Sequence, residues 1–560
     1  MKILGIHDGH NSGATLLING EITASVTEER LTRVKNESGY PKLSIDEVLK
    51  ISKLSPDDLD CVVYSSNFMH TKSHLSNISD WYRVGLEEQK RDKLKDRSYL
   101  KTVFDNRKSE RIDTVVSHLK IDKNIIKFKE HHLCHAASAF YGSHYDFDES
   151  ILVLTADGAG DGLSSTVSIS KGNKIERLTQ TDRKASLGKI YSRITFLLGL
   201  KPWEHEYKVM GLAPYGDESR AEKLIEIFEN LLDIDDESLE FSLKSEIETN
   251  YSYFYFREKL ERARFDEVSY AVQKYTEKIL KKWVTNCVKK TGIKKIACGG
   301  GVFMNVKANQ IISEINEIED IYVFPSCGDD SLSFGAVWLE YYENHNKKID
   351  FENIYLGRGF TDIEIEKDLK LNNSEIIIEK FEDINSKIAE LLFQNNIVAR
   401  FNDRMEWGAR ALGNRSILAN PSNWENVETI NNMIKKRDFW MPFAPSMLAE
   451  YADQLILNPK KLKSPFMMLA FDTLEKNKIK AAVHPRDNST RAQLVEKQKN
   501  PEYHDLIKKF YKLTNIPAVL NTSFNLHGYP LVYSPKDAIF VFENSGLNYL
   551  VLNNYLVSKK

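Results

Sequence analysis

The chain lacks the features that would place it outside the cytosol or on a charged partner. Its five cysteines contain no Cys-x-x-Cys pair and are odd in number, which argues against a disulfide framework and against a thiolate zinc site. No stretch approaches the roughly 18 apolar residues of a membrane-spanning helix, and the opening MKILGIHDGH is not typical of a secretory signal. A formal net charge of -3 gives no general attraction to nucleic acid or to an anionic membrane. We therefore expect a cytoplasmic protein that binds neither nucleic acid nor membrane.

The length and composition are those of a globular protein with more than one domain. A chain of 560 residues is too long for a single hydrophobic core, and its residues are 42% hydrophobic and 11% aromatic. From about residue 345 the sequence becomes polar and irregular before new strands and helices begin, which is typical of a linker. The sequence therefore predicts two domains, spanning residues 1–350 and 351–560.

Two segments that lie far apart in the chain share one pattern. Residues 3–20 and 151–172 each contain a β-rich apolar run, an acidic glycine turn, and a second β-rich run that closes on another glycine turn. Taken singly, each segment is consistent with an ordinary hairpin. Because glycine lets a backbone turn tightly and approach an anion, the pair predicts a duplicated α/β half with a ligand cleft between the copies.

A candidate metal site begins in the segment HHLCHAASAF. His131 and His135 are four residues apart, a spacing that puts both imidazoles on one face of a helix. Asp157 follows inside the acidic glycine turn LTADGAGDG, and Asp329 follows a predicted strand in SCGDDSL. Two solvated histidines on a helix, and an aspartate that caps a helix, are the simpler interpretations. Together the four side chains predict a site with two imidazole and two carboxylate ligands.

Three consecutive glycines mark a second candidate ligand site. A predicted strand over 296–298 enters the glycine run 299–301, and residues 302–312 are typical of a helix. Glycines at this junction let the backbone pack against a flat ligand, and the start of the helix favours phosphate or ribose oxygens. The spacing matches neither a dinucleotide fingerprint nor a P-loop. Upstream, the segment EHEYKVMGLAPYG carries Glu206 and Lys208, which we expect to face the cleft.

Charged residues are concentrated in two further regions. Residues 84–120 are densely charged and predict solvated helices inserted into the first half. The later part of the chain holds cations in glycine-, alanine- and leucine-rich sequence: Arg404, Arg410, Arg415, Lys435, Lys436, Arg437, Arg486 and Arg491. Converging guanidinium groups make a small-phosphate pocket, to which the segment NTSFN can add hydroxyl and amide groups. Scattered surface cations are the simpler interpretation.

Nine segments carry a resemblance to a known family. They are, in chain order, HDGHNSGATLL, EERLTRVKNESGYP, HHLCHAASAF, EYKVMGLAPYG, GGGVFMN, CGDD, RMEWGARALGNRSI, KKRDFWMPFAPS and NTSFN. With these segments the chain resembles, over essentially its whole length, the O-carbamoyltransferases of nodulation-factor and antibiotic biosynthesis, such as the tobramycin and cephalosporin carbamoyltransferases. The resemblance implies an α/β protein with a duplicated actin/sugar-kinase-like first domain and a YrdC-like second domain.

The resemblance also implies a reaction. Members of this family release carbamate from carbamoyl phosphate in the second domain and join it to ATP as carbamoyl-adenylate in the first. They then pass the carbamoyl group to a hydroxyl of a small natural product. His131, His135, Asp157 and Asp329 match the family's metal ligands. This donor set favours Fe(II), with Mn(II) or Zn(II) as alternatives, over Ca(II) or Mg(II).

Further site residues follow from the same resemblance. His10 matches the expected base for the acceptor hydroxyl, with Asp8 and Lys35 beside it in the motif pattern, although His10 could also simply cap a turn. The residues expected around the nucleotide are Gly299, Gly300, Gly301, Asn305, Glu206 and Lys208. The residues that fall on carbamoyl-phosphate positions are Arg410, Lys435, Arg491 and Ser523. Met441 stands where several relatives have arginine, so that phosphate contact is expected either to be missing or to be supplied by Arg437 or Arg415.

Two other functions stay open. An enzyme of the tRNA threonylcarbamoylation type shares both domain types, but near-neutral charge and the lack of a basic stripe count against it. A catalytically silent nucleotide-binding regulator is the alternative outside the enzymes, and the joint presence of His10, the four metal-ligand candidates and the cations argues against it. The sequence does not identify the small hydroxyl acceptor, and it is consistent with a homodimer.

Overall fold

The computed structural model describes residues 1–95, 97–351, 353–370, 376–435 and 438–560. The chain forms two compact units, and each is described by itself. The first comprises Met1–Glu28 and Asn36–Phe351, and the second comprises Glu352–Lys560 together with Glu29–Lys35. A short piece of the N-terminal sequence therefore belongs, by its contacts, to the second unit.

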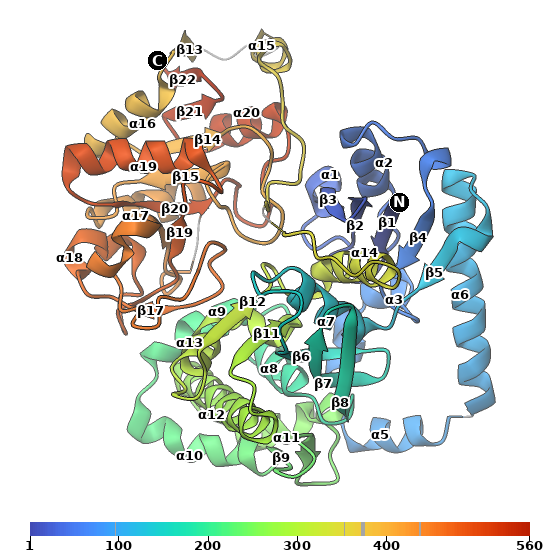
Figure 1. Cartoon of the computed structure of the whole chain (residues 1–560). Coiled ribbons are helices and arrows are strands. Elements are labelled where there is room, and N and C mark those ends of the chain that lie inside the picture. Colours follow the sequence, from blue (N-terminus) through green and yellow to red (C-terminus); the bar gives the residue numbers. More distant parts are fainter. Residues whose placement is uncertain (96, 352, 371–375, 436–437) are drawn as a thin grey trace. The chain divides into compact units, whose positions relative to one another are not determined.

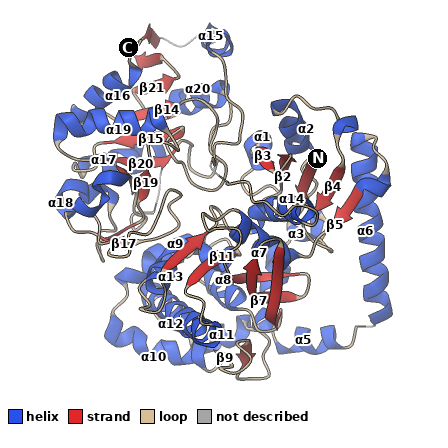
Figure 2. Cartoon of the chain, in the orientation of Figure 1, coloured by secondary structure: helices blue, strands red, loops and turns tan. Residues whose placement is uncertain are grey.

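The first unit is built on two five-stranded sheets of the same design (Figures 1 and 2). The strand order is β3-β2-β1-β4-β5 in one sheet and β8-β7-β6-β11-β12 in the other. In each sheet the first three strands pair antiparallel and the remaining pairs are parallel. The bounds are β1 (Lys2–His7), β2 (Gly13–Ile18), β3 (Glu21–Thr27), β4 (Cys61–Tyr64), β5 (Ile126–Phe128), β6 (Ile151–Gly160), β7 (Leu163–Lys171), β8 (Lys174–Asp182), β11 (Lys295–Gly299) and β12 (Asp320–Val323). The repeat confirms the predicted α/β fold with a duplicated first part.

The central strands β1 and β6 are apolar because helices cover them. Ile3, Leu4 and Ile6 of β1 are fully buried, as are Leu152 and Leu154 of β6. Helix α14 (Leu332–Tyr342) packs against β1, and helix α7 (His131–Tyr141) packs against β6. A strand buried on both faces needs such a continuous apolar run rather than an alternating one.

Helices α7 and α14 occupy equivalent places in the two halves and pack directly on each other. A Cβ added to Gly335 of α14 would lie 1.9 Å from the carbonyl oxygen of Cys134 in α7, so only glycine allows this approach. The other main helices of the unit are α2 (Lys42–Ile51), α8 (Leu187–Leu197), α9 (Glu206–Leu212), α10 (Glu218–Glu229), α11 (Tyr253–Lys259), α12 (Phe265–Thr291) and α13 (Val306–Ser313). Within the described ranges, no helix of either unit combines the length and apolar character that crossing a membrane requires.

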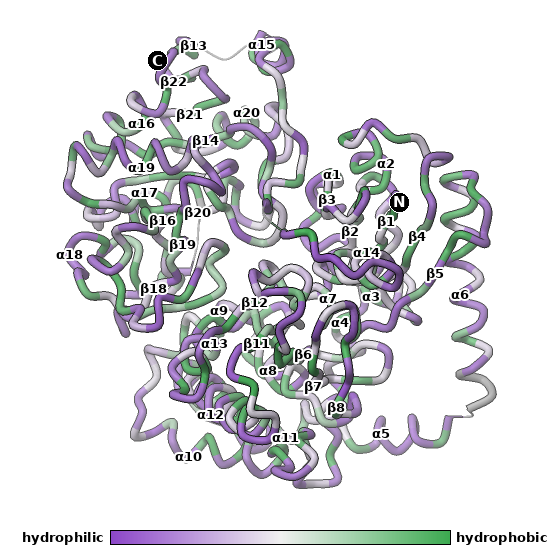
Figure 3. Tube along the Cα trace, viewed as in Figure 1, coloured by the Kyte–Doolittle hydropathy of each residue, from purple (hydrophilic) through white to green (hydrophobic). Residues whose placement is uncertain are grey.

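The charged insertion between β4 and β5 is helical, as predicted. It contains α3 (Lys72–Leu75), α4 (Ile78–Tyr82), α5 (Leu86–Lys93) and α6 (Arg97–Leu119). The trace of α5 is mainly hydrophilic (Figure 3). The expectation that the insertion is only a solvated surface is wrong, however, because Arg111 of α6 is 2% exposed and reaches the end of β1. Its contact with Asp8 is described below.

The second unit is organised around one mixed sheet with the strand order β13-β22-β21-β14-β15-β20-β16-β19. Its strands are β13 (Ile376–Lys380), β14 (Val398–Phe401), β15 (Arg415–Ala419), β16 (Ala444–Leu448), β19 (Gln493–Val495), β20 (Ala518–Ser523), β21 (Tyr549–Leu552) and β22 (Tyr555–Lys559). Its helices include α15 (Asp362–Lys370), α16 (Ile384–Phe393), α17 (Glu425–Ile430), α19 (Pro501–Thr514) and α20 (Pro535–Glu543). Phe401, Ile417, Leu520 and Leu550 of neighbouring strands form part of its core. The YrdC-like character of this unit stays a prediction.

The segment Glu29–Lys35 is fastened to the second unit by two arginines. The short helix α1 (Glu29–Thr32) carries Arg30, whose guanidinium donates to the carbonyl of Gly408 at 2.7 Å. Arg33 donates to the carbonyls of Leu531 at 2.6 Å and Pro530 at 3.0 Å. These charge-assisted hydrogen bonds explain why the segment groups with sequence 378 to 498 residues further on.

Candidate functional site

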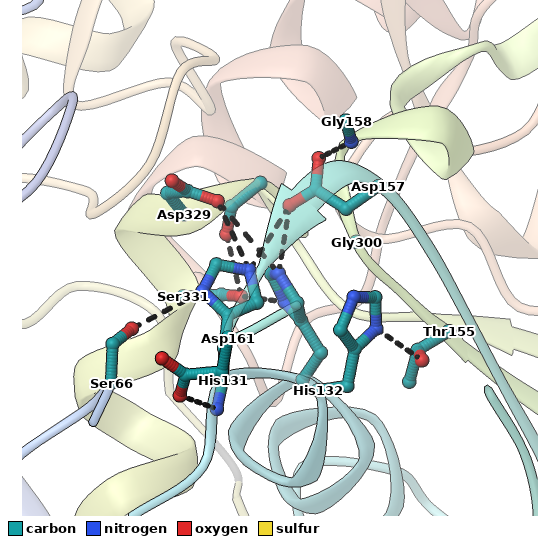
Figure 4. Close-up of polar contacts among 12 residues, drawn as sticks. Ser66, His131, His132, Thr155, Asp157, Gly158, Asp161, Gly300, Asp329 and Ser331 are labelled. Atoms are coloured by element: carbon teal, nitrogen blue, oxygen red, sulfur yellow. Dashed lines mark hydrogen bonds and ion pairs between the residues drawn. The ribbon is translucent and has the colours of Figure 1, made fainter. Parts of the chain in front are cut away.

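Four side chains from three elements of the first unit converge (Figure 4). His131 and His135 lie on the first turns of α7, Asp157 lies in β6, and Asp329 begins the turn after β12. Asp157 Oδ2 is 3.3 Å from His131 Nε2 and 3.1 Å from His135 Nε2. Asp329 Oδ1 is 3.7 Å and 3.8 Å from the same two nitrogens. One ligand atom from each side chain lies within 4.8 Å of the others.

The Nδ1 atoms of the two imidazoles, which point away from the carboxylates, each lie close to a serine hydroxyl. His131 Nδ1 lies 3.2 Å from Ser66 Oγ, and His135 Nδ1 lies 3.5 Å from Ser331 Oγ. A histidine that binds a metal through Nε2 characteristically donates its other ring N–H to such a partner, which fixes the ring orientation. The serines therefore turn both Nε2 atoms toward the two carboxylates.

The titratable groups of the cluster strongly shift one another's pKa values. Burial acts to raise the pKa of Asp157, but the hydrogen bonds from His131 and His135 outweigh it and hold that pKa well below its ordinary value. Burial, together with the negative charge of Asp157, raises the pKa of Asp329 well above its ordinary value. Burial opposes protonation of His131, yet the hydrogen bond to Asp157 and the charge of Asp329 raise its pKa to about 9. Two carboxylates this close favour a shared proton or a shared cation.

The geometry and chemistry of the cluster fit a divalent transition metal. Two ligands bound to one ion at about 2.0–2.2 Å lie roughly 3–3.6 Å apart, close to the separations found here. Two imidazoles and two carboxylates suit Fe(II), Mn(II) or Zn(II). His131, His135, Asp157 and Asp329 are the residues that would hold such an ion.

Asp161 anchors the cluster from behind and was not assigned a role from the sequence. Its Oδ2 accepts from the backbone N–H of His131 at 2.9 Å and of Asn67 at 2.8 Å, and its Oδ1 accepts from Phe68 N–H at 3.0 Å. One carboxylate thus joins the β6–β7 turn, the start of α7 and the loop after β4. The neighbouring Gly160 packs on His131, since an added Cβ would lie 2.1–2.4 Å from ring atoms of His131.

The glycine run 299–301 packs around the same cluster. A Cβ on Gly299 would lie 2.6 Å from the carbonyl oxygen of His135, and one on Gly301 would lie 2.9 Å from Asp157 Oδ1. Gly300 has a positive φ of 96° and would meet Ala156 O at 2.3 Å. The run therefore needs glycine for close packing, whatever ligand it also binds. Its role in binding adenosine stays a prediction.

His10 lies in the turn between β1 and β2, where two contacts fix it. Its Nε2 is 3.2 Å from the carbonyl oxygen of Trp203, and its own carbonyl is 3.0 Å from His7 Nε2. His7 is fully buried, and its Nε2 is also 4.0 Å from Asp329 Oδ2. No sequence motif singled out His7, yet this side chain connects the His10 turn to the metal-ligand cluster.

Asp8 is held in place by Arg111. Arg111 Nε donates to Asp8 Oδ2 and Arg111 Nη2 donates to Oδ1, each at 2.8 Å. Both side chains are almost fully buried, at 3% exposure for Asp8 and 2% for Arg111. This bidentate contact fixes the carboxylate at the end of β1. The catalytic role of Asp8 stays a prediction.

The other residues predicted for the nucleotide lie in several settings. Asn305 caps α13 by accepting from Ala308 N–H at 3.0 Å, and its amide exchanges hydrogen bonds with Gln273. Glu206 begins α9 and accepts from Trp203 N–H at 2.8 Å, while Lys208 of the same helix is buried. Burial raises the pKa of Glu206 to about 7. None of these contacts tests nucleotide binding, which stays a prediction.

In the second unit a buried amide network gathers three predicted phosphate ligands. Arg410 precedes β15, Arg491 precedes β19, and Ser523 ends β20. The Arg410 loop is tied to β20 where Asn521 Nδ2 donates to Ala411 O at 3.0 Å. It is tied to β19 where Gln493 Nε2 donates to Leu412 O at 3.1 Å. Glu406, which is 1% exposed, holds the same loop by accepting from the N–H groups of Leu412, Asn414 and Arg415.

Arg415 has a structural role. It is fully buried and stacks on Phe401 with the guanidinium carbon 3.6 Å from the ring centroid. Its terminal nitrogens donate to the backbone carbonyls of Asn402, Asp403, Arg358 and Asn414. These contacts fix the guanidinium within the second unit. The phosphate contact of Arg415 stays a prediction.

Three further residues were predicted for the sites: two have side chains that the structure does not describe, and the third groups with the second unit. Arg437 lies outside the described residues, and Lys435 ends the turn Asn431–Lys435 with its side chain outside the description. Lys35 belongs to the segment that groups with the second unit, whereas Asp8 and His10 belong to the first. The joint role of Lys35 and His10 therefore stays a prediction.

Comparison with known proteins defines the class. The family model "Carbamoyltransferase N-terminus" matches residues 2–338, and "Carbamoyltransferase C-terminus" matches residues 389–559. The chain belongs to the carbamoyltransferase family and is an enzyme of that class. This confirms the resemblance seen in the nine sequence segments.

Curated relatives match over most of their own length. An uncharacterised protein of Methanocaldococcus jannaschii, MJ1051, is 35% identical over 100% of this chain and 99% of its own. Nodulation protein NolNO of Sinorhizobium fredii is 31% identical over 98% of this chain and 79% of its own. Nodulation protein NolO of Bradyrhizobium diazoefficiens is 33% identical over 77% of this chain and 79% of its own.

Proposed function

We propose that this carbamoyltransferase is an ATP- and metal-dependent O-carbamoyltransferase that acts on a small hydroxyl-bearing acceptor. The observation that carries the proposal is the convergence of His131, His135, Asp157 and Asp329 in the duplicated first unit. Carbamoyl transfer alone needs no such cluster. Activation of a carboxylate-like group by ATP does call for charge neutralisation next to phosphate oxygens.

The proposed reaction has three steps. Water attacks the phosphorus of carbamoyl phosphate bound near Arg410, Arg491 and Ser523, the bond from phosphorus to the carbamoyl oxygen breaks, and carbamate leaves with that electron pair as inorganic phosphate forms. A carbamate oxygen then attacks the α-phosphorus of ATP, which releases pyrophosphate and forms carbamoyl-adenylate. Finally the acceptor oxygen attacks the carbamoyl carbon, the bond to the adenylate oxygen breaks, and AMP leaves with that electron pair. When bound, a divalent metal would hold phosphate oxygens and offset the charge that develops on them.

His10 is the residue proposed to receive the acceptor's proton in the last step. A histidine whose pKa lies near neutrality is suited to remove a hydroxyl proton as attack proceeds. Its carbonyl and its ring are both held by neighbours, so its position is set before a substrate binds. All five cysteines are free and buried, which supports a cytoplasmic setting for the enzyme.

The first test measures AMP formation without an acceptor. Wild-type protein supplied with Fe(II) or Mn(II), ATP and carbamoyl phosphate should form AMP and pyrophosphate, which mass spectrometry detects. His135→Ala and Arg410→Ala should each lose at least about 100-fold of this activity, as removal of a group that acts on developing charge typically does. AMP formation that does not require carbamoyl phosphate, or ADP in its place, would reject the proposal. Full activity in Arg410→Ala alone would reject the assigned carbamoyl-phosphate site.

Lys189 supports a phosphate-binding role for the first unit. It lies in the first turn of α8 and is 9% exposed. A Cβ on Gly158 would lie 3.8 Å from its Cε and 3.9 Å from its Nζ, so its ammonium lies over the turn that follows Asp157. Burial lowers the pKa of Lys189 to about 8, while the charges of Asp157 and Asp329 act to raise it. A buried lysine beside this turn is suited to an anionic substrate group.

Replacing Lys189 separates phosphate binding from metal binding. Lys189→Met should raise the Kd for ATP by roughly 10- to 100-fold because a buried charge partner is lost, and should leave the affinities for adenosine and Mn(II) unchanged. Titration calorimetry and electron paramagnetic resonance measure these affinities. Lys184→Met, which removes an exposed lysine just before α8, is the matched control. Equal losses for adenosine and ATP would show that Lys189 only supports the fold.

A further inference from the structure

Trp203 is held in an unusual conformation next to the proposed base. Its φ is 66°, in the left-handed region that bulky residues rarely enter. Its N–H donates to Glu206 Oε1 at 2.8 Å, and its carbonyl accepts from His10 Nε2 at 3.2 Å. The two hydrogen bonds hold the backbone in this state. Strain that neighbours maintain in this way is a recognised mark of functional sites.

The carbonyl of Trp203 determines which nitrogen of His10 is basic. A carbonyl oxygen can only accept, so His10 Nε2 must carry the hydrogen. In the neutral imidazole the lone pair then lies on Nδ1. Trp203 thereby selects one tautomer of His10 without touching the nitrogen that would take up a proton.

The indole of Trp203 begins a series of aromatic rings that leads away from His10. Its ring centroid is 5.3 Å from that of His10 and 5.7 Å from that of Trp81, which it meets edge-on. Trp81 in turn contacts His70 at 4.9 Å and His74 at 4.7 Å. Trp81 and Trp203 are half-buried and His74 is exposed, so the series runs from the site to the surface.

The series is fixed to the core of the first unit. Arg193 of α8, which is 1% exposed, donates to the carbonyl of Trp81 at 3.0 Å and stacks on Tyr82 at 4.0 Å. The loop that leads into this region begins at Phe68, whose N–H is held by Asp161. These contacts tie the aromatic series to the same elements that carry the metal-ligand cluster.

We propose that Trp203 positions His10 through its carbonyl and, with Trp81, forms the face on which a ring-bearing alcohol binds as acceptor. This inference rests on the proposed function. In the transfer step the acceptor O–H gives its proton to His10 Nδ1, and the acceptor oxygen bonds to the carbamoyl carbon as AMP leaves. Two indoles that meet edge-on, bordered by imidazoles, favour a cyclic alcohol over an acyclic one, because the ring buries carbon on the indoles while its hydroxyls meet the polar edge.

The test compares a ring alcohol with the smallest alcohol. Wild type is supplied with ATP, carbamoyl phosphate, Mn(II) and either cis-1,2-cyclohexanediol or methanol, and the carbamates are measured by mass spectrometry. We expect kcat/KM for the diol to exceed that for methanol at least tenfold. Trp81→Ala and Trp203→Gly should each reduce the ratio of kcat/KM for the diol to that for methanol at least tenfold. Phe254→Ala, which removes an exposed aromatic ring of the same unit, should change none of these values.

Trp203→Gly and Trp203→Ala separate the ring from the backbone. Glycine adopts a positive φ readily and should keep the His10 contact, whereas alanine is strained there and should loosen it. The 15N spectrum of histidine-labelled protein reports the tautomer, with the His10 signal identified by its loss in His10→Gln. We expect the Nε2–H tautomer in wild type and Trp203→Gly, and a mixture in Trp203→Ala.

The possible results test the ring-binding face, the positioning role of Trp203 and the proposed function separately. Equal rates with both alcohols, or transfer to methanol only, would overturn the ring-binding face. An Nδ1–H tautomer of His10 in wild type would overturn the positioning role. Failure of wild type to form any AMP from ATP and carbamoyl phosphate would reject the proposed function instead, and the tautomer spectrum would still decide the positioning role by itself.

Discussion

Replacing Gly160 with alanine should disable the first unit's metal-ligand cluster. The added methyl group would lie 2.1–2.4 Å from Cγ, Cδ2 and Nδ1 of His131, so the imidazole has to leave its position. Because displacement of a catalytic group by about 1 Å can cost ~100-fold in rate, we expect at least that loss in AMP formation. Mn(II) affinity, measured by electron paramagnetic resonance, should fall in parallel.

Gly158 provides the matched control for this substitution. It lies in the same acidic turn, but the nearest atom to a Cβ there is Lys189 Cε at an ordinary 3.8 Å. Gly158→Ala should therefore bind Mn(II) as wild type does. A Gly160→Ala protein with wild-type Mn(II) affinity would show that His131 does not hold the ion. Unfolding curves for both variants distinguish a local displacement from a loss of the fold, since overpacking typically costs about 1–3 kcal/mol.

Removing Arg111 should cause the largest loss of stability that we predict. Arg111→Met removes the bidentate partner of the Asp8 carboxylate, which is 3% exposed, and leaves the more distant Arg107, whose Nη2 lies 3.9 Å from Asp8 Oδ2. Breaking a buried ion pair from one side typically costs about 3–5 kcal/mol. The variant also loses the stacking of Arg111 on Tyr64, where the guanidinium carbon lies 4.3 Å from the ring centroid. Urea unfolding of the full-length protein measures the change.

Two further variants sharpen this prediction. Arg91→Met, which removes a 72% exposed arginine paired with Glu88, should change stability by no more than about 1 kcal/mol. The double variant Asp8→Asn/Arg111→Met should be more stable than Arg111→Met alone, because no unpaired charge is left buried. If Arg111→Met and Arg91→Met destabilise the protein equally, the bidentate contact does not contribute as the structure indicates.

Local pattern was sufficient to predict the four metal-ligand candidates. His131 and His135 face the same way because any helix places residues four apart on one side. Asp157 and Asp329 lie next to the two histidines because the duplicated fold brings the ends of β6 and β12 to one edge of the same sheet. The repeated strand pattern predicted this duplication. Each of these motifs is local in the sequence. The repeat of the strand–turn–strand pattern predicted that motifs far apart in the chain lie close together.

What the sequence could not supply were partners that lie far away in the chain. Arg111 looked like one more charge in a solvated run, and only the packing of α6 shows that it neutralises Asp8. An arginine in apolar sequence suggested a phosphate pocket, so Arg415 was predicted as a phosphate ligand. In the structure its guanidinium nitrogens donate to backbone carbonyl oxygens. Neither contact leaves a local pattern, because each depends on which loop the fold brings alongside.

The placement of Glu29–Lys35 restricts how the enzyme can be taken apart. Arg30 and Arg33 satisfy carbonyls of Gly408, Pro530 and Leu531, so a fragment that starts at residue 352 would lose these donors. A fragment that stops at residue 351 would instead carry a charged helix without its binding surface. The boundary between the units is therefore not a single cut point in the chain. To study either unit separately, residues 29–35 have to be kept with the second unit, for instance by fusing them to it through a linker.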